Sequence, residues 1–236
     1  MITAIMQPYF FPYIGYFQLM SAVDTFVFFD DVQYIERGWV NRNLIRGRDE
    51  PVWLTMPVQN ASRNLAINRR QYALCNGATL ALIQRRLRAS YARATCLLEA
   101  DPLISGFLEF DDANVAVFNA NLLTGMARQL DINCRFLVSS HIDKPDGLRG
   151  QSKVIDLCRR IGASRYVNPI GGIDLYEKVA FEEAGLELSF LQTSVEPTVM
   201  NDGPCHLSII DHLMMRGLKK TSDLMAQYDL LPKDES

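Results

Sequence analysis

The chain alternates short apolar runs with longer segments in which apolar residues recur every three or four positions. The first pattern is typical of buried strands and the second of amphipathic helices. We expect strands at residues 2–6, 24–29, 52–58, 134–140, 165–169 and 186–191. We expect helices at residues 13–23, 70–92, 108–130, 151–161, 176–184 and 208–216, with breaks near Gly77 and Asp101-Pro102.

The first three elements form a strand–helix–strand unit, which predicts parallel pairing with a right-handed crossover. The continued alternation predicts an α/β fold, a three-layer sandwich with a mostly parallel Rossmann-like sheet and a helical insertion at about residues 70–130. We treat residues 1–236 as a single α/β domain. The tail from Lys219 is expected to fray.

Ligands of such sheets bind beyond the carboxyl ends of the strands. The informative loops therefore follow Met6, Phe29, Ser140 and Asn168. Each of them carries polar or aromatic residues.

Composition narrows the class of protein. The 236 residues suffice for one large core or for a core with an insertion, and 48% hydrophobic with 22% charged residues is typical of globular domains. With 24 basic and 27 acidic residues, the net charge of −3 argues against nucleic-acid binding. No apolar run reaches the roughly 20 residues of a membrane span, and no basic segment precedes a signal-type core, so we expect a cytoplasmic location. Five scattered cysteines without a CxxC pair argue against a disulfide framework and a zinc site.

The first loop, residues 7–12, leads from a strand into a helix that opens with residues 13–16. A helix N-terminus offers unpaired N–H groups and a positive dipole end to an anion, and Gly15 would allow close approach to the backbone. We therefore expect a phosphate-bearing ligand here. The candidate binding residues are Gln7, Tyr9, Tyr13, Gly15 and Tyr16. The alternative is an aromatic plug that only packs the core.

The spacing of Tyr13, Gly15 and Tyr16 is similar to the HxGH motif of the nucleotidylyltransferase superfamily, with tyrosine at both histidine positions. A phenol can donate to a phosphate oxygen but cannot act as a cation there. The loop therefore favours phosphate binding over nucleotidyl transfer.

A second candidate segment starts where the second strand ends. Asp30 and Asp31 could hold a metal or accept a hydrogen bond from a ribose or an amine, so we take them as catalytic candidates. Arginines can bind carboxylate or phosphate as bidentate forks, and aromatic rings can stack on a flat ring. The candidate binding residues are Gln33, Tyr34, Arg37, Trp39, Asn41, Arg42 and Asn43. Because no cluster has sharp metal-ligand spacing, we assign no metal; the alternative is a solvated loop with a helix cap.

Two later strand ends carry further candidates. Ser139, Ser140 and Lys153 could clamp a phosphate, and nucleophilic catalysis by a serine stays open although no G-x-S-x-G elbow frames it. The alternative is a capping serine with a surface lysine. Gly172 and Tyr176 follow the next strand as binding candidates, unless the glycine serves only the turn.

His206 is the third catalytic candidate, because it is the best-placed general base near a helix start. Ser208 there is expected to cap that helix, with Asp211 three residues on. The alternative is a packed or surface histidine.

Together these segments resemble the WbqC-like family over about residues 3–218. The resemblance rests on residues 6–19 (MQPYFFPYIGYFQL), 30–34, 39–43, 57–58, 139–140, 162–176 and 207–211. It implies a relation to proteins encoded among surface-polysaccharide (O-antigen) genes, for which aminoacyl transfer to an amino sugar has been proposed.

We therefore expect a transferase that moves an acyl or aminoacyl group to an amino sugar or similar acceptor in polysaccharide biosynthesis. Its partner would be a small phosphate-bearing or nucleotide-activated substrate. The alternatives are a nucleotidylyltransferase-like enzyme using a nucleoside triphosphate and a non-catalytic ligand-binding protein. The sequence leaves the cofactor and the oligomeric state unknown.

Overall fold

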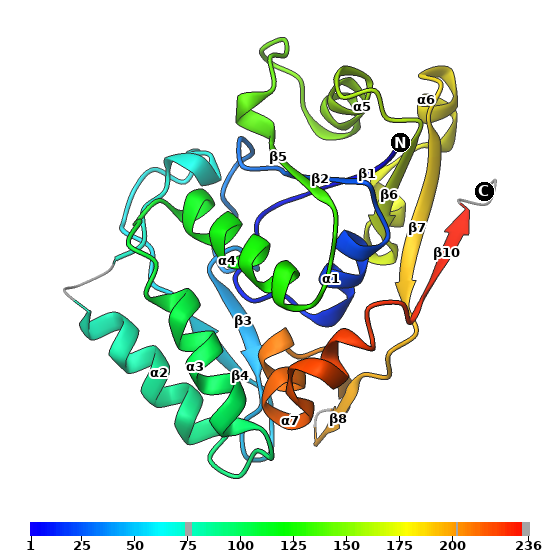
Figure 1. Cartoon of the computed structure of the whole chain (residues 1–236). Helices are drawn as coiled ribbons and strands as arrows, with labels where there is room; N and C mark the ends of the chain where they lie inside the picture. Colours follow the sequence, from blue (N-terminus) through cyan, green and yellow to red (C-terminus); the bar gives the residue numbers. More distant parts are fainter. Residues whose placement is uncertain (74–76, 202, 233–236) are drawn as a thin grey trace.

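The structure, a computed structural model, describes residues 1–73, 77–201 and 203–232. At its centre lies a six-stranded sheet in the order β10-β7-β6-β1-β2-β5 (Figure 1). Its strands are β1 (Ile2–Met6), β2 (Thr25–Phe28), β5 (Arg135–Val138), β6 (Arg165–Pro169), β7 (Glu187–Thr193) and β10 (Tyr228–Pro232). All neighbours pair in parallel except β7 and β10. The expected α/β fold with a mostly parallel sheet is therefore confirmed.

The strand order contains one reversal. The chain builds β1, β2 and β5 outward in one direction, returns to place β6 beside β1, and then adds β7 and β10 on that side. Counted in chain order, this is the 3-2-1-4-5-6 arrangement of Rossmann-like sheets, whose ligands bind at the reversal. The crevice beyond the carboxyl ends of β1 and β6 is therefore the first place to look for a site.

The strands bury side chains on both faces, as their near-continuous apolar sequences require. Ile5 and Val27 belong to a buried cluster with α5 (Gly150–Arg160) and α6 (Lys178–Glu183). Ala4 and Phe26, one position away, belong to a larger cluster with α1 (Ile14–Ser21). Side chains alternate across a strand, so these clusters lie on opposite faces.

The middle of the chain supplies three helices, α2 (Ala78–Ser90), α3 (Leu97–Leu108) and α4 (Val115–Gln129). The helical section is thus present, but the expected start at residue 70 is wrong, because Gln71 and Tyr72 form extended bridges and the chain turns at residues 67–69. The rest of that start, residues 74–76, lies outside the described residues.

The expected break at Asp101-Pro102 is also wrong, since α3 runs through Pro102. A proline inside a helix leaves the carbonyl four residues earlier without its N–H partner. That carbonyl belongs to Leu98, which is 92% exposed, so water can satisfy it.

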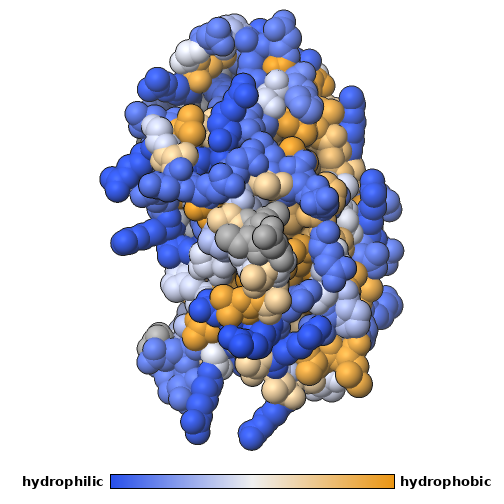
Figure 2. Space-filling view, turned by 90° about the vertical axis from the view of Figure 1, so that its left-hand side faces the viewer, coloured by the Kyte–Doolittle hydropathy of each residue, from blue (hydrophilic) through white to orange (hydrophobic). Residues whose placement is uncertain are grey.

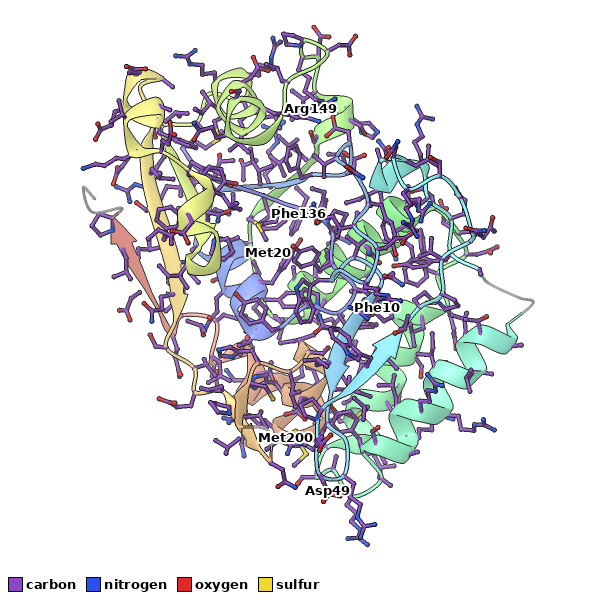
Figure 3. The ribbon with its side chains drawn as sticks, turned by 180° about the vertical axis from the view of Figure 1, so that it is seen from behind. Phe10, Met20, Asp49, Phe136, Arg149 and Met200 are labelled. Atoms are coloured by element: carbon purple, nitrogen blue, oxygen red, sulfur yellow. The ribbon has the colours of Figure 1, made fainter. Side chains whose placement is uncertain are left out.

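An antiparallel ribbon, β3 (Arg42–Ile45) with β4 (Val52–Thr55), stands apart from the main sheet. The strand expected at residues 52–58 therefore exists in shortened form but pairs with a strand that we did not expect. A small hairpin, β8 (Thr198–Met200) with β9 (Gly203–Cys205), lies near the tip of this ribbon: Figure 3 shows Met200 close to Asp49, and the Asn201 N–H donates to the Asp49 carbonyl.

The C-terminal segment is ordered as far as the structure describes it, so the expected fraying from Lys219 is wrong there. Helix α7 (Ile209–Ser222) contains a non-helical Gly217 with φ 78° and continues past it. Strand β10 then closes the sheet edge along β7. The Gln18 amide donates to the carbonyls of Leu224 and Gln227, which ties the connection to α1.

The outer surface is predominantly hydrophilic on the face shown in Figure 2, where hydrophobic residues form small patches. Within the described ranges, no helix has the length and apolar character that crossing a bilayer requires.

Candidate functional site

Two cavities open at the carboxyl ends of the parallel strands. The first, which we name the aromatic cavity, has a volume of about 440 Å³. It lies beyond β1, β6 and β7 and is lined by Tyr9, Pro12, Tyr13, Trp39, Asn43, Ile170, Gly171, Leu191, Gln192, Thr193 and His206. The second, the lysine cavity, has about 1240 Å³, lies beyond β2 and β5, and includes Asp31, Gln33, Ser140, Lys144, Arg149 and Lys153 in its lining.

The first loop forms one wall of the aromatic cavity, and its backbone is held by distant segments. The Asn119 amide donates to the Pro8 carbonyl (2.8 Å) and the Ser208 hydroxyl to the Phe11 carbonyl (2.7 Å). Phe11 has a left-handed φ of 40°, and Phe10 is buried in the interior (Figure 3). These contacts fix where the side chains of the loop point.

Tyr13 and Gly15 are coupled by packing. A Cβ atom on Gly15 would lie 2.4 Å from Cε2 of Tyr13, so the glycine leaves space for that ring. The Tyr13 ring therefore covers the start of α1, where we expected an anion. Tyr16 is buried and donates its hydroxyl hydrogen to the Gln7 carbonyl (2.7 Å). Of the five candidates in this loop, Tyr9 and Tyr13 line the cavity, and the other three do not.

The phenols at this site act as hydrogen-bond donors. Burial raises the pKa of Tyr9 and of Tyr13 above the usual value, so both stay protonated at neutral pH. The negative charge of a phosphate or carboxylate oxygen would thus meet an O–H group rather than a phenolate.

The end of β6 is ordered by a second hydrogen-bond network. The Tyr166 hydroxyl lies 3.0 Å from the Tyr176 hydroxyl and also 3.0 Å from Oδ1 of Asn168. A Cβ on Gly172 would lie 2.1 Å from Nδ2 of Asn168, so this glycine is needed by the asparagine. Gly172 and Tyr176 thus shape the turn that delivers Gly171 to the aromatic cavity.

His206 lies at the rim of the aromatic cavity, with its ring centroid 5.5 Å from that of Tyr13. Partial burial lowers the pKa of His206 below the usual value. The imidazole is therefore neutral at pH 7 and free to accept a proton. The structure thus places His206 beside Tyr13 in the lining of the aromatic cavity, and its role as a general base stays a prediction.

Asp31 organises the lysine cavity. Its carboxylate accepts from the Ser139 hydroxyl (2.7 Å), from Nζ of Lys153 (2.9 Å) and from Nζ of Lys144 (2.9 Å). Burial alone would raise the pKa of Asp31, but the hydrogen bonds from Lys144, Ser139 and Lys153 outweigh it and lower that pKa. Both lysine side chains are only about one-tenth exposed, 11% and 10%. One carboxylate thus holds two buried cations in place.

Lys144 escaped the sequence analysis because it stands in a loop rich in proline, glycine and aspartate. The signal that could have found it is its position after Ser139 and Ser140, on the connection that leads from β5 into the helix carrying Lys153.

Asp30, only 3% exposed, is saturated by neighbours. It accepts from the backbone N–H (2.9 Å) and the hydroxyl (2.6 Å) of Ser140 and from the Asn68 amide (3.1 Å). Its carboxylate ties the end of β2 to the end of β5 and to the turn before residue 70. These three hydrogen bonds make Asp30 a link between the two strand ends.

The start of α5 borders the lysine cavity through Arg149 and Gly150. The N-cap residue Arg149 makes no side-chain capping hydrogen bond within the described part of the chain, so the first N–H groups of α5 are candidates for binding a ligand. Arg69 adds a further cation to the lining, while Asp143 and Asp146 offset part of the charge. An anion would find buried cations, an arginine and helix N–H groups along one wall.

The candidates between Asp31 and the ribbon divide into two groups. Tyr34 and Asn41 are buried: the Tyr34 hydroxyl donates to Oδ1 of Asn41 (2.8 Å), whose amide donates to the Met56 carbonyl (2.9 Å). Asn43 is buried too, lines the aromatic cavity, and its amide donates to the Phe10 carbonyl (3.3 Å).

The second group is closer to solvent. Gln33 lines the lysine cavity and Trp39 the aromatic one. The Arg42 guanidinium stacks over the Trp53 ring, 3.9 Å from its centroid, and donates to the carbonyls of Gly38 and Arg37. Exposed Arg37 has a left-handed φ of 59°. Neither arginine is part of the lining of the two cavities.

The structure therefore gathers nine of the candidates into two groups. Tyr9, Tyr13, Trp39, Asn43 and His206 line the aromatic cavity. Asp31, Gln33, Ser140 and Lys153 line the lysine cavity.

Comparison with known proteins gives matches that extend over most of the chain. The model of the WbqC-like protein family matches residues 7–223. The chain is also 30% identical over 190 residues to the uncharacterized protein Rv1507c of Mycobacterium tuberculosis, a match that covers 80% of each chain. No solved structure gives a significant match. The chain belongs to the WbqC-like protein family.

Proposed function

We propose that this protein is a transferase that attaches an acyl or aminoacyl group to the amine of an amino sugar, or of a similar phosphate-bearing acceptor, in surface polysaccharide biosynthesis. The observation that carries the proposal is a pair of cavities at the carboxyl ends of adjacent strands of one sheet. A neutral imidazole stands in an aromatic cavity at the strand-order reversal, and a cavity with two buried lysines opens at the adjacent strand ends. The family resemblance supplies the link to polysaccharide genes.

In this proposal the amino sugar occupies the aromatic cavity. Tyr9 and Tyr13 donate hydrogen bonds to it, and Asn43 and Trp39 complete the walls. The amine nitrogen attacks the carbonyl carbon of an activated acyl group, a C–N bond forms, and the bond from that carbon to the leaving group breaks. The proton lost by the amine passes to the neutral imidazole of His206.

The lysine cavity holds the phosphate of the sugar phosphate or nucleotide-linked substrate. Lys144 and Lys153 supply the charge, and the start of α5 supplies N–H groups. Asp31 is a poor base here, because its lowered pKa and its two ion pairs keep the carboxylate ionised and make it reluctant to accept a proton. We therefore assign Asp30 and Asp31 to positioning rather than to proton transfer.

The test uses two variants with opposite expectations. His206→Gln should bind glucosamine phosphate like the wild type, measured by calorimetry, but should lose about 10²-fold or more in amide product, measured by mass spectrometry. Lys153→Ala should weaken binding of glucosamine phosphate while leaving binding of unphosphorylated glucosamine unchanged.

Two results would contradict the proposal. If neither sugar phosphates nor nucleotide sugars change the melting temperature of the wild type, the proposed class of ligand is wrong. Product formation by His206→Gln at the wild-type rate would remove the base.

The non-catalytic binding protein remains the second candidate, because both carboxylates at the strand ends are already saturated by hydrogen bonds. It predicts wild-type binding of glucosamine phosphate with no product from any acyl donor. The nucleotidylyltransferase alternative predicts pyrophosphate release from ATP or CTP; the Tyr13 ring over Gly15 stands where its triphosphate would have to approach the start of α1.

A further inference from the structure

Two tryptophan side chains lie exposed beside the aromatic cavity. Trp39 lines that cavity and is 42% exposed, and Trp53 on β4 is 41% exposed. Their ring centroids are 5.3 Å apart and their planes are tilted by 43°. Exposed tryptophans held side by side at a cavity mouth are typical of a binding surface, since large aromatic side chains otherwise tend to be buried.

Contacts anchor the backbone of Trp39 and one face of the Trp53 ring. The Trp39 carbonyl accepts a hydrogen bond from the Phe10 N–H, which fixes this residue to the first loop. Trp53 sits on the ribbon opposite Leu44 and is backed by the Arg42 guanidinium at 3.9 Å. Arg42 is itself bound to the carbonyls of Gly38 and Arg37. The two indoles therefore form a preorganised platform, which lowers the entropic cost of binding.

We infer that the Trp39–Trp53 platform is an outer subsite that stacks on a sugar ring of an acceptor longer than one residue. This inference rests on the proposed function, because it takes the aromatic cavity as the seat of the modified amino sugar. A volume of about 440 Å³ is at the small end of ligand pockets, which span roughly 300–1,000 Å³. Such a cavity suits one sugar residue with its substituent, so the rest of a saccharide must leave across its mouth, where Trp39 stands.

The shape of the platform favours a saccharide over a nucleobase. A flat base gains most between two parallel faces, whereas rings tilted by 43° present a curved surface. The C–H face of a pyranose stacks on a single indole, and successive residues of a saccharide are rotated with respect to one another. The Arg42 guanidinium at the platform already has carbonyl partners and a ring beneath it, so it is poorly placed to recruit a nucleotide phosphate.

The experiment uses the fact that the chain has only two tryptophans, so selectively excited tryptophan emission reports the platform alone. The probes are glucosamine and its β-1,4-linked tetramer, titrated into the full-length wild type, Trp53→Ala and Val52→Ala. Val52 is the matched control, since it is 41% exposed on the same strand but has no aromatic ring. We expect the tetramer to shift the emission of the wild type and of Val52→Ala at concentrations about tenfold lower than the monomer does.

Calorimetry with Trp53→Ala should show that this tenfold preference is lost while the affinity for the monomer stays within about twofold. Equal affinity of wild type for monomer and tetramer would overturn the inference. So would an emission shift by UDP alone that Trp53→Ala abolishes, or a wild-type dimer in light scattering that Trp53→Ala dissociates; these would assign the platform to a nucleobase or to a second copy of the chain.

The two proposals can fail separately. Loss of product in His206→Gln with no tetramer preference in the wild type would retain the transferase and remove the outer subsite. A tetramer preference without any amide product would retain the saccharide platform and remove the transferase.

Discussion

Asp31 shows how one carboxylate determines the electrostatics of a cavity. Replacing it by asparagine would leave Lys144 and Lys153, whose side chains are about one-tenth exposed, without their counter-ion, and removing one partner of a mostly buried ion pair is costly. We expect Asp31→Asn to lower the free energy of unfolding by about 3 kcal/mol at pH 7, measured by urea denaturation. Exposed Asp146→Asn, at the same cavity, is the control and should change it by less than about 0.5 kcal/mol.

The pH dependence gives this prediction a sign. The pKa of Asp31 is lower in the folded protein than in the unfolded chain, so its contribution is complete above the unfolded value near 4 and is lost as the pH falls through the folded value. The difference between wild type and Asp31→Asn should therefore shrink below about pH 4. A difference that persists unchanged into acid would mean that the lysines are not what Asp31 stabilises.

His212 makes a separate, residue-level prediction. It is buried on α7, its Nδ1 atom has no hydrogen-bond partner among the described residues, and burial lowers its pKa to about 4, against an opposing effect of Asp211. Between about pH 6.5 and 4 the unfolded chain binds a proton at this histidine that the folded protein does not bind. The free energy of unfolding therefore falls as the pH is lowered, by up to about 1.4 kcal/mol per pH unit.

The measurement is the change in unfolding free energy between pH 7 and pH 5. His212→Gln should lose less stability over this interval than the wild type, whereas exposed His141→Gln should follow the wild type. Parallel curves for wild type and His212→Gln would show that His212 does not stay neutral in the folded protein.

At the scale of elements, the start of α1 needs glycine at position 15 because the Tyr13 ring occupies the space of a Cβ atom there. Gly15→Ala adds a methyl group that would stand 2.4 Å from the far edge of the Tyr13 ring, so the ring must swing away. Alanine in a helix is favoured over glycine by about 1 kcal/mol, which offsets the cost of moving the ring. We therefore expect stability within about 0.5 kcal/mol of wild type but weaker binding of glucosamine, measured by calorimetry, because the aromatic cavity loses a wall.

Gly106→Ala on α3 is the matched control. A Cβ there meets no atom within 4 Å, and the position is exposed. It should raise the free energy of unfolding by about 0.5–1 kcal/mol and leave binding unchanged. Strong destabilisation by Gly15→Ala together with normal binding would contradict the coupling of Gly15 to the cavity.

The elements that the sequence predicts well are those with undiluted apolar runs. The central strands β1 and β2 carry such runs, and both lie within one residue of the expected limits. Strand β3 begins with Arg42 and Asn43, and their polar side chains are typical of a loop. The Asn43 amide is nevertheless buried, because it donates to the Phe10 carbonyl of the first loop. Strand β10 lies in the tail that we expected to fray, because its order comes from pairing with β7, which the local sequence does not reveal.

The candidate site is predictable only in its parts. Strand-end loops identified Tyr13 and Asp31 as candidates, because parallel sheets place ligands there. His206 was identified by its chemistry near a helix start. Their distribution into two cavities follows from the order β6-β1-β2-β5, which depends on contacts between segments more than 100 residues apart. Lys144 needs the same information, since only the closeness of Asp31 distinguishes it from any loop lysine.

At the scale of the whole molecule, the helical section is joined to the sheet by one continuous core. The larger buried cluster contains Phe17 from α1, Ile104 from α3, Leu122 from α4 and Leu213 from α7. Polar contacts run the same way: the Asn119 amide on α4 holds the Pro8 carbonyl of the first loop. A section that shares its core with the sheet cannot unfold without exposing the apolar surface of both.

We therefore expect the chain to unfold as a single domain in one cooperative transition. Urea denaturation should give the same midpoint by tryptophan emission and by far-ultraviolet circular dichroism. The first probe reports only the ribbon region, because Trp39 and Trp53 are the chain's two tryptophans, while the second weighs all helices, including those of residues 78–129.

Leu122→Ala, in the shared core, should lower both midpoints together, at a cost of about 2–5 kcal/mol. Leu98→Ala, on the exposed side of α3, should move neither. Separate midpoints in the wild type, or a Leu122→Ala variant in which only the circular dichroism transition shifts, would show that the helical section is an independent folding unit attached to the sheet.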